Sequence, residues 1–142
     1  MKSRWSDLAA TLLSLLALAV VYFITIRVYE GVPHIEDETA YSWQAATYAR
    51  GDLTLSSPPC PKCFLVPFVV DYQGQRFSKY PPCWPALLSL GVRLDAREWV
   101  NPILAALCVW LTYRLGKKLV NEAVGLVAAL LTLTSPFFLL NG

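Results

Sequence analysis

The chain has 142 residues, of which 56% are hydrophobic and 15% are charged, and its formal net charge is +2. This apolar content is concentrated in three runs, and too little polar sequence remains to cover three buried helices of a soluble domain. The nearly neutral balance also lacks the basic footprint of a nucleic-acid-binding protein. We therefore expect a mainly α, polytopic membrane protein without a nucleic-acid partner.

The first apolar run extends from Leu8 to Ile26, 19 residues without a charge. About 20 apolar residues cross a bilayer core, so residues 1–26 are predicted to hold a cytoplasmic N-terminus and a transmembrane helix. A cleaved signal peptide is disfavoured because the apolar region is too long and residues 25–29 lack small side chains at cleavage spacing. We expect a retained signal anchor.

Residues 99–142 contain two further apolar runs. Residues 99–113 form a run of 15, which reaches spanning length if Arg114 snorkels and the helix continues to Gly116. Residues 123–142 form a run of 20. This run ends with the chain, without anchoring charges, so we expect the N-terminal part of a longer polytopic protein or a truncated copy of one.

The basic residues predict the orientation of these spans. Two clusters flank them, one before the first span and one between the second and third: Lys2 and Arg4, then Arg114, Lys117 and Lys118. Because basic clusters remain in the cytoplasm, both are expected there. Residues 27–98 then form a large extracytoplasmic loop of a multi-pass protein of the cell or inner membrane.

The loop begins with an acidic run, Pro33-His34-Ile35-Glu36-Asp37-Glu38. Glu36 or Asp37 suits the cap of a helix predicted from Glu38 to Arg50, and Gly51 suits its C′ position. Aromatic and short polar side chains alternate along this helix, which is typical of a helix lying in the headgroup region. Packing on the loop's own core explains the pattern equally well.

A proline-rich stretch follows. Phe64 to Tyr72 is predicted to be a strand, the turn at Asp71-Tyr72-Gln73-Gly74 reverses the chain, and Arg76-Phe77 returns as a small hairpin. Next, Pro81-Pro82 enforces an extended segment after Lys79, and Pro85 fits the first turn of another helix. Lys79 is thus expected on a stiff tether beside a helix N-terminus, an arrangement that favours an anion such as a phosphate, although this feature alone fits a solvated lysine of a proline-rich loop better.

Two motifs together resemble a family of membrane enzymes. The first runs from Gly31 to Tyr41 and contains the acidic residues; the second is Phe77-Ser78-Lys79-Tyr80-Pro81-Pro82-Cys83-Trp84-Pro85. Asn101-Pro102 and Ser135-Pro136-Phe137-Phe138 fit the same pattern. The chain resembles the N-terminal part of a GT-C membrane glycosyltransferase of family 39, which includes protein O-mannosyltransferases and aminoarabinose transferases. Such enzymes transfer a sugar from a polyprenyl-phosphate donor to an acceptor outside the membrane.

The resemblance implies roles for four residues. Asp37 is the candidate catalytic base, which takes the proton of the acceptor hydroxyl as the sugar leaves on phosphate. Glu38 would support it, although neighbouring helix residues point about 100° apart and do not form one dyad. Lys79 and Tyr80 would bind the lipid phosphate. No cofactor is assigned, and a divalent metal beside Asp37 is left open. Relatives carry glycine where this chain has Cys83.

Three cysteines lie in the loop: Cys60 and Cys63 form a C-x-x-C, and Cys83 follows twenty residues on. An oxidising exterior permits a disulfide between any two of them. A zinc site would need a fourth ligand, and His34 is the only histidine.

Two alternatives to the enzyme remain. One is a truncated, non-catalytic membrane protein or subunit that binds lipid. The weaker one is a thiol-redox membrane protein that uses Cys60 and Cys63.

Overall fold

The computed structural model describes residues 2–141 and is mainly helical. It divides into two compact units. The helical unit contains both ends of the chain, up to Glu30 and from Glu98 onward, and the loop unit is Gly31–Arg97. Each unit is described separately below.

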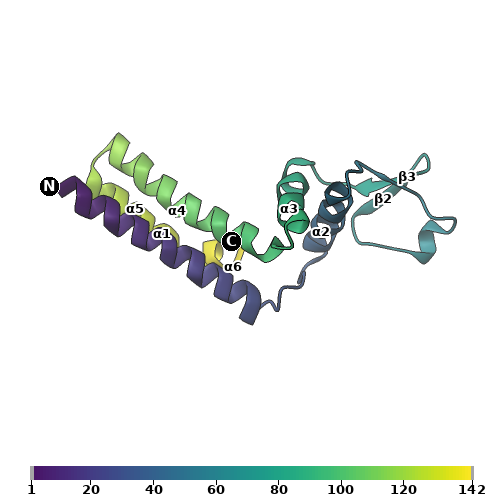
Figure 1. Ribbon diagram of the computed structural model, residues 1–142, viewed down its shortest axis with the longest axis horizontal. Helices are drawn as coiled ribbons and strands as arrows, with labels where there is room; N and C mark the ends of the chain where they lie inside the picture. The colour runs from purple at the N-terminus through teal and green to yellow at the C-terminus, as the bar shows by residue number, and fades with distance from the viewer. Residues whose placement is uncertain (1, 142) are drawn as a thin grey trace. The chain divides into compact units, whose positions relative to one another are not determined.

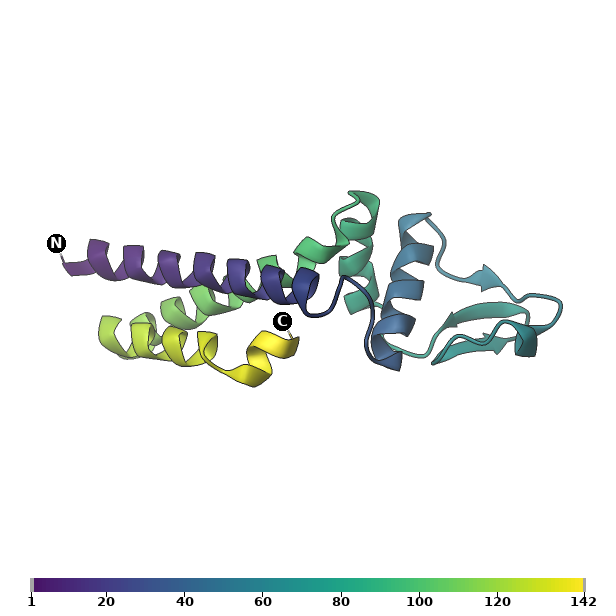
Figure 2. The same ribbon diagram turned by 90° about the horizontal axis from the view of Figure 1, so that it is seen from below.

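The helical unit contains α1 (Lys2–Arg27), α4 (Val100–Leu119), α5 (Glu122–Leu133) and the short α6 (Pro136–Asn141). A 3₁₀ turn at Arg97–Trp99 precedes α4. Helices α1, α4 and α5 lie side by side in both ribbon views (Figures 1 and 2).

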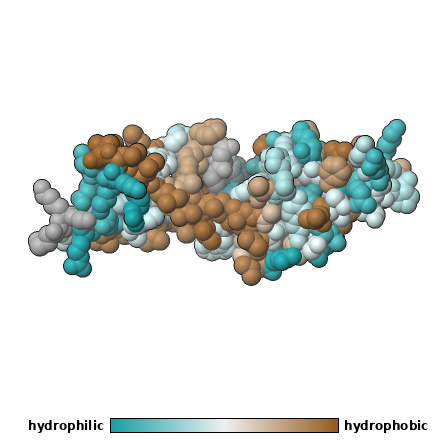
Figure 3. Space-filling model, turned by 90° about the horizontal axis from the view of Figure 1, so that it is seen from above, coloured by the Kyte–Doolittle hydropathy of each residue, from teal (hydrophilic) through white to brown (hydrophobic). Residues whose placement is uncertain are grey.

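Most side chains in the interior of the helical unit are small, with Tyr113 and Leu133 as exceptions, while many large apolar ones face outward. The buried positions recur every three or four residues along each helix: Ser6, Ala10, Ser14, Ala17 and Val21 on α1; Pro102, Ala105, Val109 and Tyr113 on α4; Gly125, Ala129 and Leu133 on α5. Exposed side chains include Leu12 and Phe23, and Figure 3 shows apolar surface over much of this unit. Small residues let helix backbones approach closely, as they do in membrane bundles.

The closest approach in the helical unit is between α4 and α5. A Cβ atom built on Gly116 would lie 2.7 Å from the Cα atom of Gly125, and one built on Gly125 would lie 2.6 Å from the Tyr113 carbonyl oxygen. Side chains larger than hydrogen therefore do not fit at this crossing.

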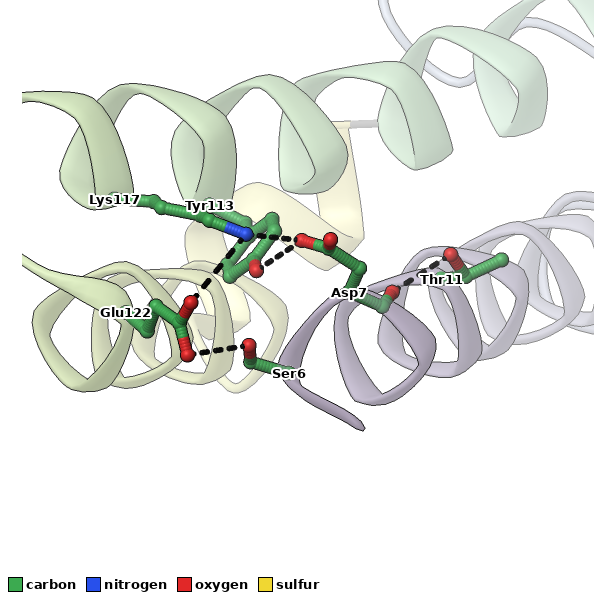
Figure 4. Close-up of polar contacts among 6 residues, drawn as sticks. All are labelled: Ser6, Asp7, Thr11, Tyr113, Lys117 and Glu122. Carbon is green, nitrogen blue, oxygen red and sulfur yellow. Dashed lines mark hydrogen bonds and ion pairs between the residues drawn. The ribbon is translucent and has the colours of Figure 1, made fainter. Parts of the chain in front are cut away.

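A polar network joins the ends of these three helices (Figure 4). The Lys117 Nζ atom lies 2.6 Å from Asp7 Oδ1 and 3.7 Å from Glu122 Oε1. The Tyr113 hydroxyl also donates to Asp7, and the Ser6 hydroxyl donates to Glu122 at 2.8 Å. The N-terminus of α1, the C-terminus of α4 and the N-terminus of α5 therefore lie at the same end of the unit.

The three predicted spans differ from the helices observed. Among the described residues, one helix is long and apolar enough to cross a membrane, the segment Arg4–Arg27 of α1, a property that signal sequences and buried core helices share. Helix α4 runs past Gly116 to Leu119, so its last turn is basic.

The prediction of one continuous third helix is wrong. Helix α5 ends at Leu133 and α6 begins at Pro136, where the chain bends (Figure 2). Proline has no N–H to continue the helix and restricts the residue before it, so Pro136 starts a new helix instead.

The loop unit contains two helices and a small sheet. Its elements are α2 (Glu36–Ala49), β1 (Leu55–Ser56), a 3₁₀ turn (Pro61–Cys63), β2 (Val69–Tyr72), β3 (Gln75–Ser78) and α3 (Cys83–Arg93). The sheet has the order β1-β3-β2, and both pairs are antiparallel. Helix α2 packs against α3 and against β3.

The predicted hairpin is confirmed, with a shorter first strand. Gln73 and Gly74 have φ values of 50° and 76°, which matches the two-residue type I′ turn that suits the twist of paired strands. Tyr72 pairs with Gln75, and Val69 pairs with Ser78. The strand begins at Val69 rather than Phe64, and β1 was not predicted.

Helix α2 begins two residues earlier than expected. Ile35 is its N-cap residue and makes no side-chain cap, so neither Glu36 nor Asp37 has the predicted capping role. Instead, the Glu38 carboxylate accepts a hydrogen bond from the backbone N–H of His34 at 2.8 Å.

The end of α2 is as predicted. Gly51, with φ of 96°, donates to the Tyr48 carbonyl, and Asp52 donates to the Thr47 carbonyl, which is a Schellman motif.

The buried face of α2 consists of Ala40, Gln44, Ala45 and Thr47. The helix therefore packs on the core of its own unit, as the alternative interpretation expected. A position in the headgroup region stays a prediction. Helix α3 starts at Cys83, so Pro85 lies in its first turn as expected, but the N-cap residue Pro82 has φ of −73° and ψ of −19°, which is helical rather than the extended backbone predicted for Pro81-Pro82.

Candidate functional site

The two sequence motifs meet at one hydrogen bond in the loop unit. The Tyr80 hydroxyl donates to Asp37 Oδ1, although the two residues are 43 positions apart in the chain. Asp37 lies in the first turn of α2, and Tyr80 lies between β3 and α3. The resemblance assigned Tyr80 to the lipid phosphate, and the structure places its hydroxyl on Asp37.

A buried glutamine brings these elements together. The Gln44 side chain is 2% exposed, donates to the Leu53 carbonyl at 3.0 Å and accepts from the Ser78 backbone N–H at 2.7 Å. Ser78 Oγ in turn accepts from the Tyr80 backbone N–H at 3.3 Å. The hairpin is thereby fixed against α2 two residues before Tyr80.

Two aromatic rings pack against the Tyr80 ring, beside its hydrogen bond to Asp37. The Tyr41 ring, one helical turn after Asp37, lies 4.6 Å from the Tyr80 ring, centroid to centroid. The Phe68 ring contacts Tyr80 edge-on at 5.8 Å. Tyr41, Phe68 and Tyr80 therefore form one aromatic cluster, which Tyr80 connects to the half-buried Asp37.

Lys79 lies over two rings of this aromatic cluster. Its Nζ atom lies 3.4 Å from the centroid of the Phe68 ring and 4.9 Å from that of Tyr80. Its backbone N–H donates to the Phe68 carbonyl at 3.0 Å, which continues the hairpin by one pair. A cation over ring faces keeps its charge and its N–H donors, so Lys79 retains the capacity to bind an anion.

Phe68 is held in an uncommon backbone conformation, with φ of 57°. For a bulky residue this left-handed conformation costs about 1 to 3 kcal/mol, and such residues gather at functional sites. Here it accompanies the ring contact with both Lys79 and Tyr80.

The Tyr80 phenol has a raised pKa. Desolvation by burial raises its pKa from 10.0 to about 12, with smaller contributions from the hydrogen bond to Asp37 and the charges of Asp37, Tyr41 and Glu36. Tyr80 therefore remains a protonated donor at neutral pH, and Asp37 remains its acceptor.

The three carboxylates of the acidic run have different surroundings. Asp37 is half-buried and accepts from Tyr80, whereas Glu38 is exposed and turns back toward His34. Glu36 is exposed. Asp37 and Glu38 thus point to different partners, as expected for adjacent helix residues, and they do not form a dyad.

The cysteines adopt one of the three pairings that the sequence allowed. Cys60 and Cys63 form a disulfide with an S–S distance of 2.12 Å, and Cys83 is a free, exposed thiol. The pairings of Cys83 with Cys60 or Cys63 are therefore not formed. Within residues 2–141, no group of three or more His, Cys, Asp or Glu side chains is placed to hold a metal ion.

Comparison of the chain with protein families, curated proteins and solved structures finds no match.

Two residues of this site were missed by the sequence reasoning. Gln44 had no signal, because a glutamine in a helix is ordinarily exposed. For Phe68 the sequence did contain a signal. The turn at Gln73-Gly74 pairs Tyr72 with Gln75, and continuing this antiparallel register away from the turn places Phe68 opposite Lys79.

Proposed function

We propose that the chain is part of an integral membrane glycosyltransferase, which transfers a sugar from a polyprenyl-phosphate donor to an acceptor at the outer face of the membrane. In this proposal the helical unit supplies three transmembrane helices, with α5 and α6 as a broken third span. The loop unit is extracytoplasmic and carries the site around Asp37.

The helical unit supports a bilayer location. Its interior consists mostly of small residues, with Tyr113 and Leu133 as larger members, and large apolar side chains such as Leu12, 58% exposed, and Phe23, 60% exposed, face outward. Exposed apolar surface of this kind is typical of contact with lipid or with further helices. Arg4 near the N-terminus of α1 and the basic residues near the C-terminus of α4 lie at the same end of the unit, as the positive-inside rule requires of a shared cytoplasmic side, whereas Arg27 lies at the opposite end of α1.

The observation that carries the enzymatic proposal is the hydrogen bond between Tyr80 and Asp37. The resemblance to family 39 enzymes rests on two separate motifs, which would make one site only if they meet. In this chain a base, a phenol and a cation lie within one cluster.

These residues would act on different parts of the reaction. Asp37 would take the proton of the acceptor hydroxyl, since a carboxylate oriented by a phenol is a competent general base. Lys79 would neutralise the charge that develops on the departing lipid phosphate. Tyr80 would orient Asp37 with its single hydroxyl proton and would bind the phosphate only by exchanging that partner, and Glu38 would hold the start of α2.

The substitution Asp37→Asn tests the catalytic assignment. We expect it to lower sugar transfer from a polyprenyl-phosphate donor in membranes by about a hundredfold or more, because the general base is lost. The matched control is Asp52→Asn, an exposed carboxylate of the same unit that makes no side-chain contact with the site. Near-normal turnover by Asp37→Asn would reject the role of Asp37, and a wild-type protein without turnover would favour the non-catalytic, lipid-binding alternative.

Lys79→Ala separates phosphate binding from proton transfer. Loss of a charge-assisted contact is expected to raise the apparent KM for the donor lipid about tenfold. Lys62→Ala, at another exposed lysine of the loop unit, is the control. An unchanged KM for the lipid would count against the phosphate role.

One observation favours thiol chemistry as a second candidate: both members of the Cys60–Cys63 disulfide are exposed. A partner dithiol would attack the bridge, form a mixed disulfide and leave oxidised, with two thiols on this chain. Thiol counting by mass after incubation with a reduced dithiol protein tests this. A bridge that stays closed would remove the candidate.

A further inference from the structure

Three basic residues lie in the last two turns of α4, and the structure separates them into two kinds. Lys117 turns toward Asp7 and Glu122 and is compensated by them (Figure 4). Arg114 and Lys118 are exposed, and no carboxylate in the described part of the chain forms an ion pair with either of them. Two positive charges at this end of the helical unit are therefore left for another partner.

These two cations line an open groove of about 800 Å3. Its other lining residues are Trp110, Leu111, Leu115 and Lys117. Trp110, Arg114 and Lys118 are four residues apart, so they form one row along the helix. Leu111 and Leu115 form the neighbouring row, and they are 54% and 59% exposed.

The Arg114 guanidinium lies 5.9 Å from the centroid of the Trp110 ring. This contact holds the cation at the level of an aromatic ring, the pair that membrane proteins place at the headgroup boundary. A basic row beside an apolar row suits a ligand that has an anionic head and an apolar body.

We propose that this groove of α4 binds an anionic phospholipid of the membrane, with its phosphate on Arg114 and Lys118 and its acyl chain along Leu111 and Leu115. Trp110 continues the row of the two cations beside Leu111, at the boundary of the headgroup layer. The inference rests on the proposed function only for the bilayer location of the helical unit, and it does not depend on sugar transfer at Asp37.

A purely structural role for the same residues makes a different prediction. Cations in the last turn of a helix are stabilised by the helix dipole, whatever lipid surrounds them. Such a role would leave the protein without preference between anionic and zwitterionic lipids, so lipid selectivity distinguishes the two.

The test uses the full chain reconstituted into phosphatidylcholine vesicles. A minor, equal fraction of brominated lipid is added, either phosphatidylglycerol or phosphatidylcholine, and quenching of tryptophan fluorescence is measured. The signal of Trp110 is isolated by comparison with Trp110→Phe, because the chain has 5 tryptophans. Membrane insertion is checked separately by alkaline extraction.

We expect stronger quenching of Trp110 by the brominated phosphatidylglycerol. Arg114→Gln with Lys118→Gln should lower the relative affinity for the anionic lipid about tenfold or more, given the usual attraction of one basic residue to an anionic surface. The exchange Arg114→Lys with Lys118→Arg should retain the preference. The control pair Arg50→Gln with Lys62→Gln, which removes two exposed charges of the loop unit, should retain it too.

Three results would overturn the inference. Equal quenching by both lipids, with the protein inserted, would leave Arg114 and Lys118 a structural role only. Loss of the preference on adding inorganic phosphate would assign a soluble anion instead of a lipid. A chain extracted from the vesicles by alkali would reject the bilayer location as well, whereas failure of sugar transfer alone would leave the lipid site intact.

Discussion

In the helical unit two helix backbones approach closely at Gly116 and Gly125, whereas in the loop unit the buried side chain of Gln44 bridges a helix and a sheet. The buried positions of the helical unit are mostly alanine, glycine and valine, and most of its leucines are exposed, although Leu133 is buried. The loop unit instead buries hydrogen-bonded polar groups, among them Thr47, Arg76 and Ser78.

The difference in packing is the one expected if the helical unit lies in a bilayer and the loop unit in water, as proposed above. Outward-facing leucine is costly in water and favourable in lipid, so helices in a bilayer gain stability from close backbone packing rather than from burying large side chains. A small unit in water cannot build a large apolar core, and it relies on satisfied polar contacts to define a single packing. We therefore expect that different kinds of substitution destabilise the two units.

The largest effect is expected in the loop unit, from Gln44→Ala. It removes two hydrogen bonds and leaves the Leu53 carbonyl and the Ser78 N–H without their partner, which should lower the free energy of unfolding by about 2 to 4 kcal/mol. Amide hydrogen exchange of the full chain, read at Ser78, measures it.

The matched control is Gln75→Ala. Gln75 accepts a hydrogen bond from Thr54 at 2.5 Å on an exposed surface, where water replaces the lost partner. If both glutamine variants changed the exchange at Ser78 equally, the buried bridge would not be what fixes the hairpin against α2.

A smaller effect is expected in the helical unit, from Gly125→Ala. The added Cβ atom would lie 2.6 Å from the Tyr113 carbonyl oxygen and 2.8 Å from the Lys117 backbone nitrogen, so α4 and α5 must separate. Overpacking of this kind should lower the free energy of unfolding by about 1 to 3 kcal/mol. Unfolding of the full chain in detergent, followed by circular dichroism, measures it.

The control for this substitution is Val127→Ile, which also adds one carbon to α5 but at a side chain that is 56% exposed. Its stability should stay close to wild type. A Gly125→Ala variant as stable as this control would show that the two helices do not approach as closely as their glycines indicate.

The smallest effect is a pH dependence of the loop unit. Because the folded-state pKa of Tyr80 is raised from 10.0 to about 12, its contribution to stability is fully present below pH 10.0 and is lost as the pH rises toward 12. The tyrosinate absorbance of the wild type minus that of Tyr80→Phe should therefore show a step near pH 12.

Asp37→Asn should move that step to lower pH only in part, since burial is a larger cause of the raised Tyr80 pKa than the contact with Asp37. Tyr72→Phe, at an exposed tyrosine of the same hairpin, should leave the step in place. A step that disappeared with Tyr72→Phe would show that Tyr80 is not the buried phenol.

The accuracy of the sequence reasoning followed the range of the interactions. The hairpin turn at Gln73-Gly74 and the end of α2 at Gly51 were predicted correctly, because each depends on the backbone freedom of a few adjacent residues. The start of α2 was missed. Three carboxylates follow one another there, and no local rule shows that Glu38, rather than Glu36 or Asp37, accepts a backbone hydrogen bond, which comes from His34. The break at Pro136 had a local signal that the apolar composition of residues 123–142 outweighed.

Asp37 was identified from its motif, but its contact with Tyr80 was not, since the approach of residues 43 positions apart depends on how α2 packs on the hairpin. The sequence by itself determined the apolar runs, the turn chemistry and the residue types at the candidate site, because these follow from side-chain polarity and local backbone preference. Only the tertiary structure decided which partners those residues meet, that Cys60 pairs with Cys63, and that Gln44 bridges a helix and a sheet. The physical reason is that a buried polar group is stable only where packing supplies its partner, and that partner lies far away in the chain.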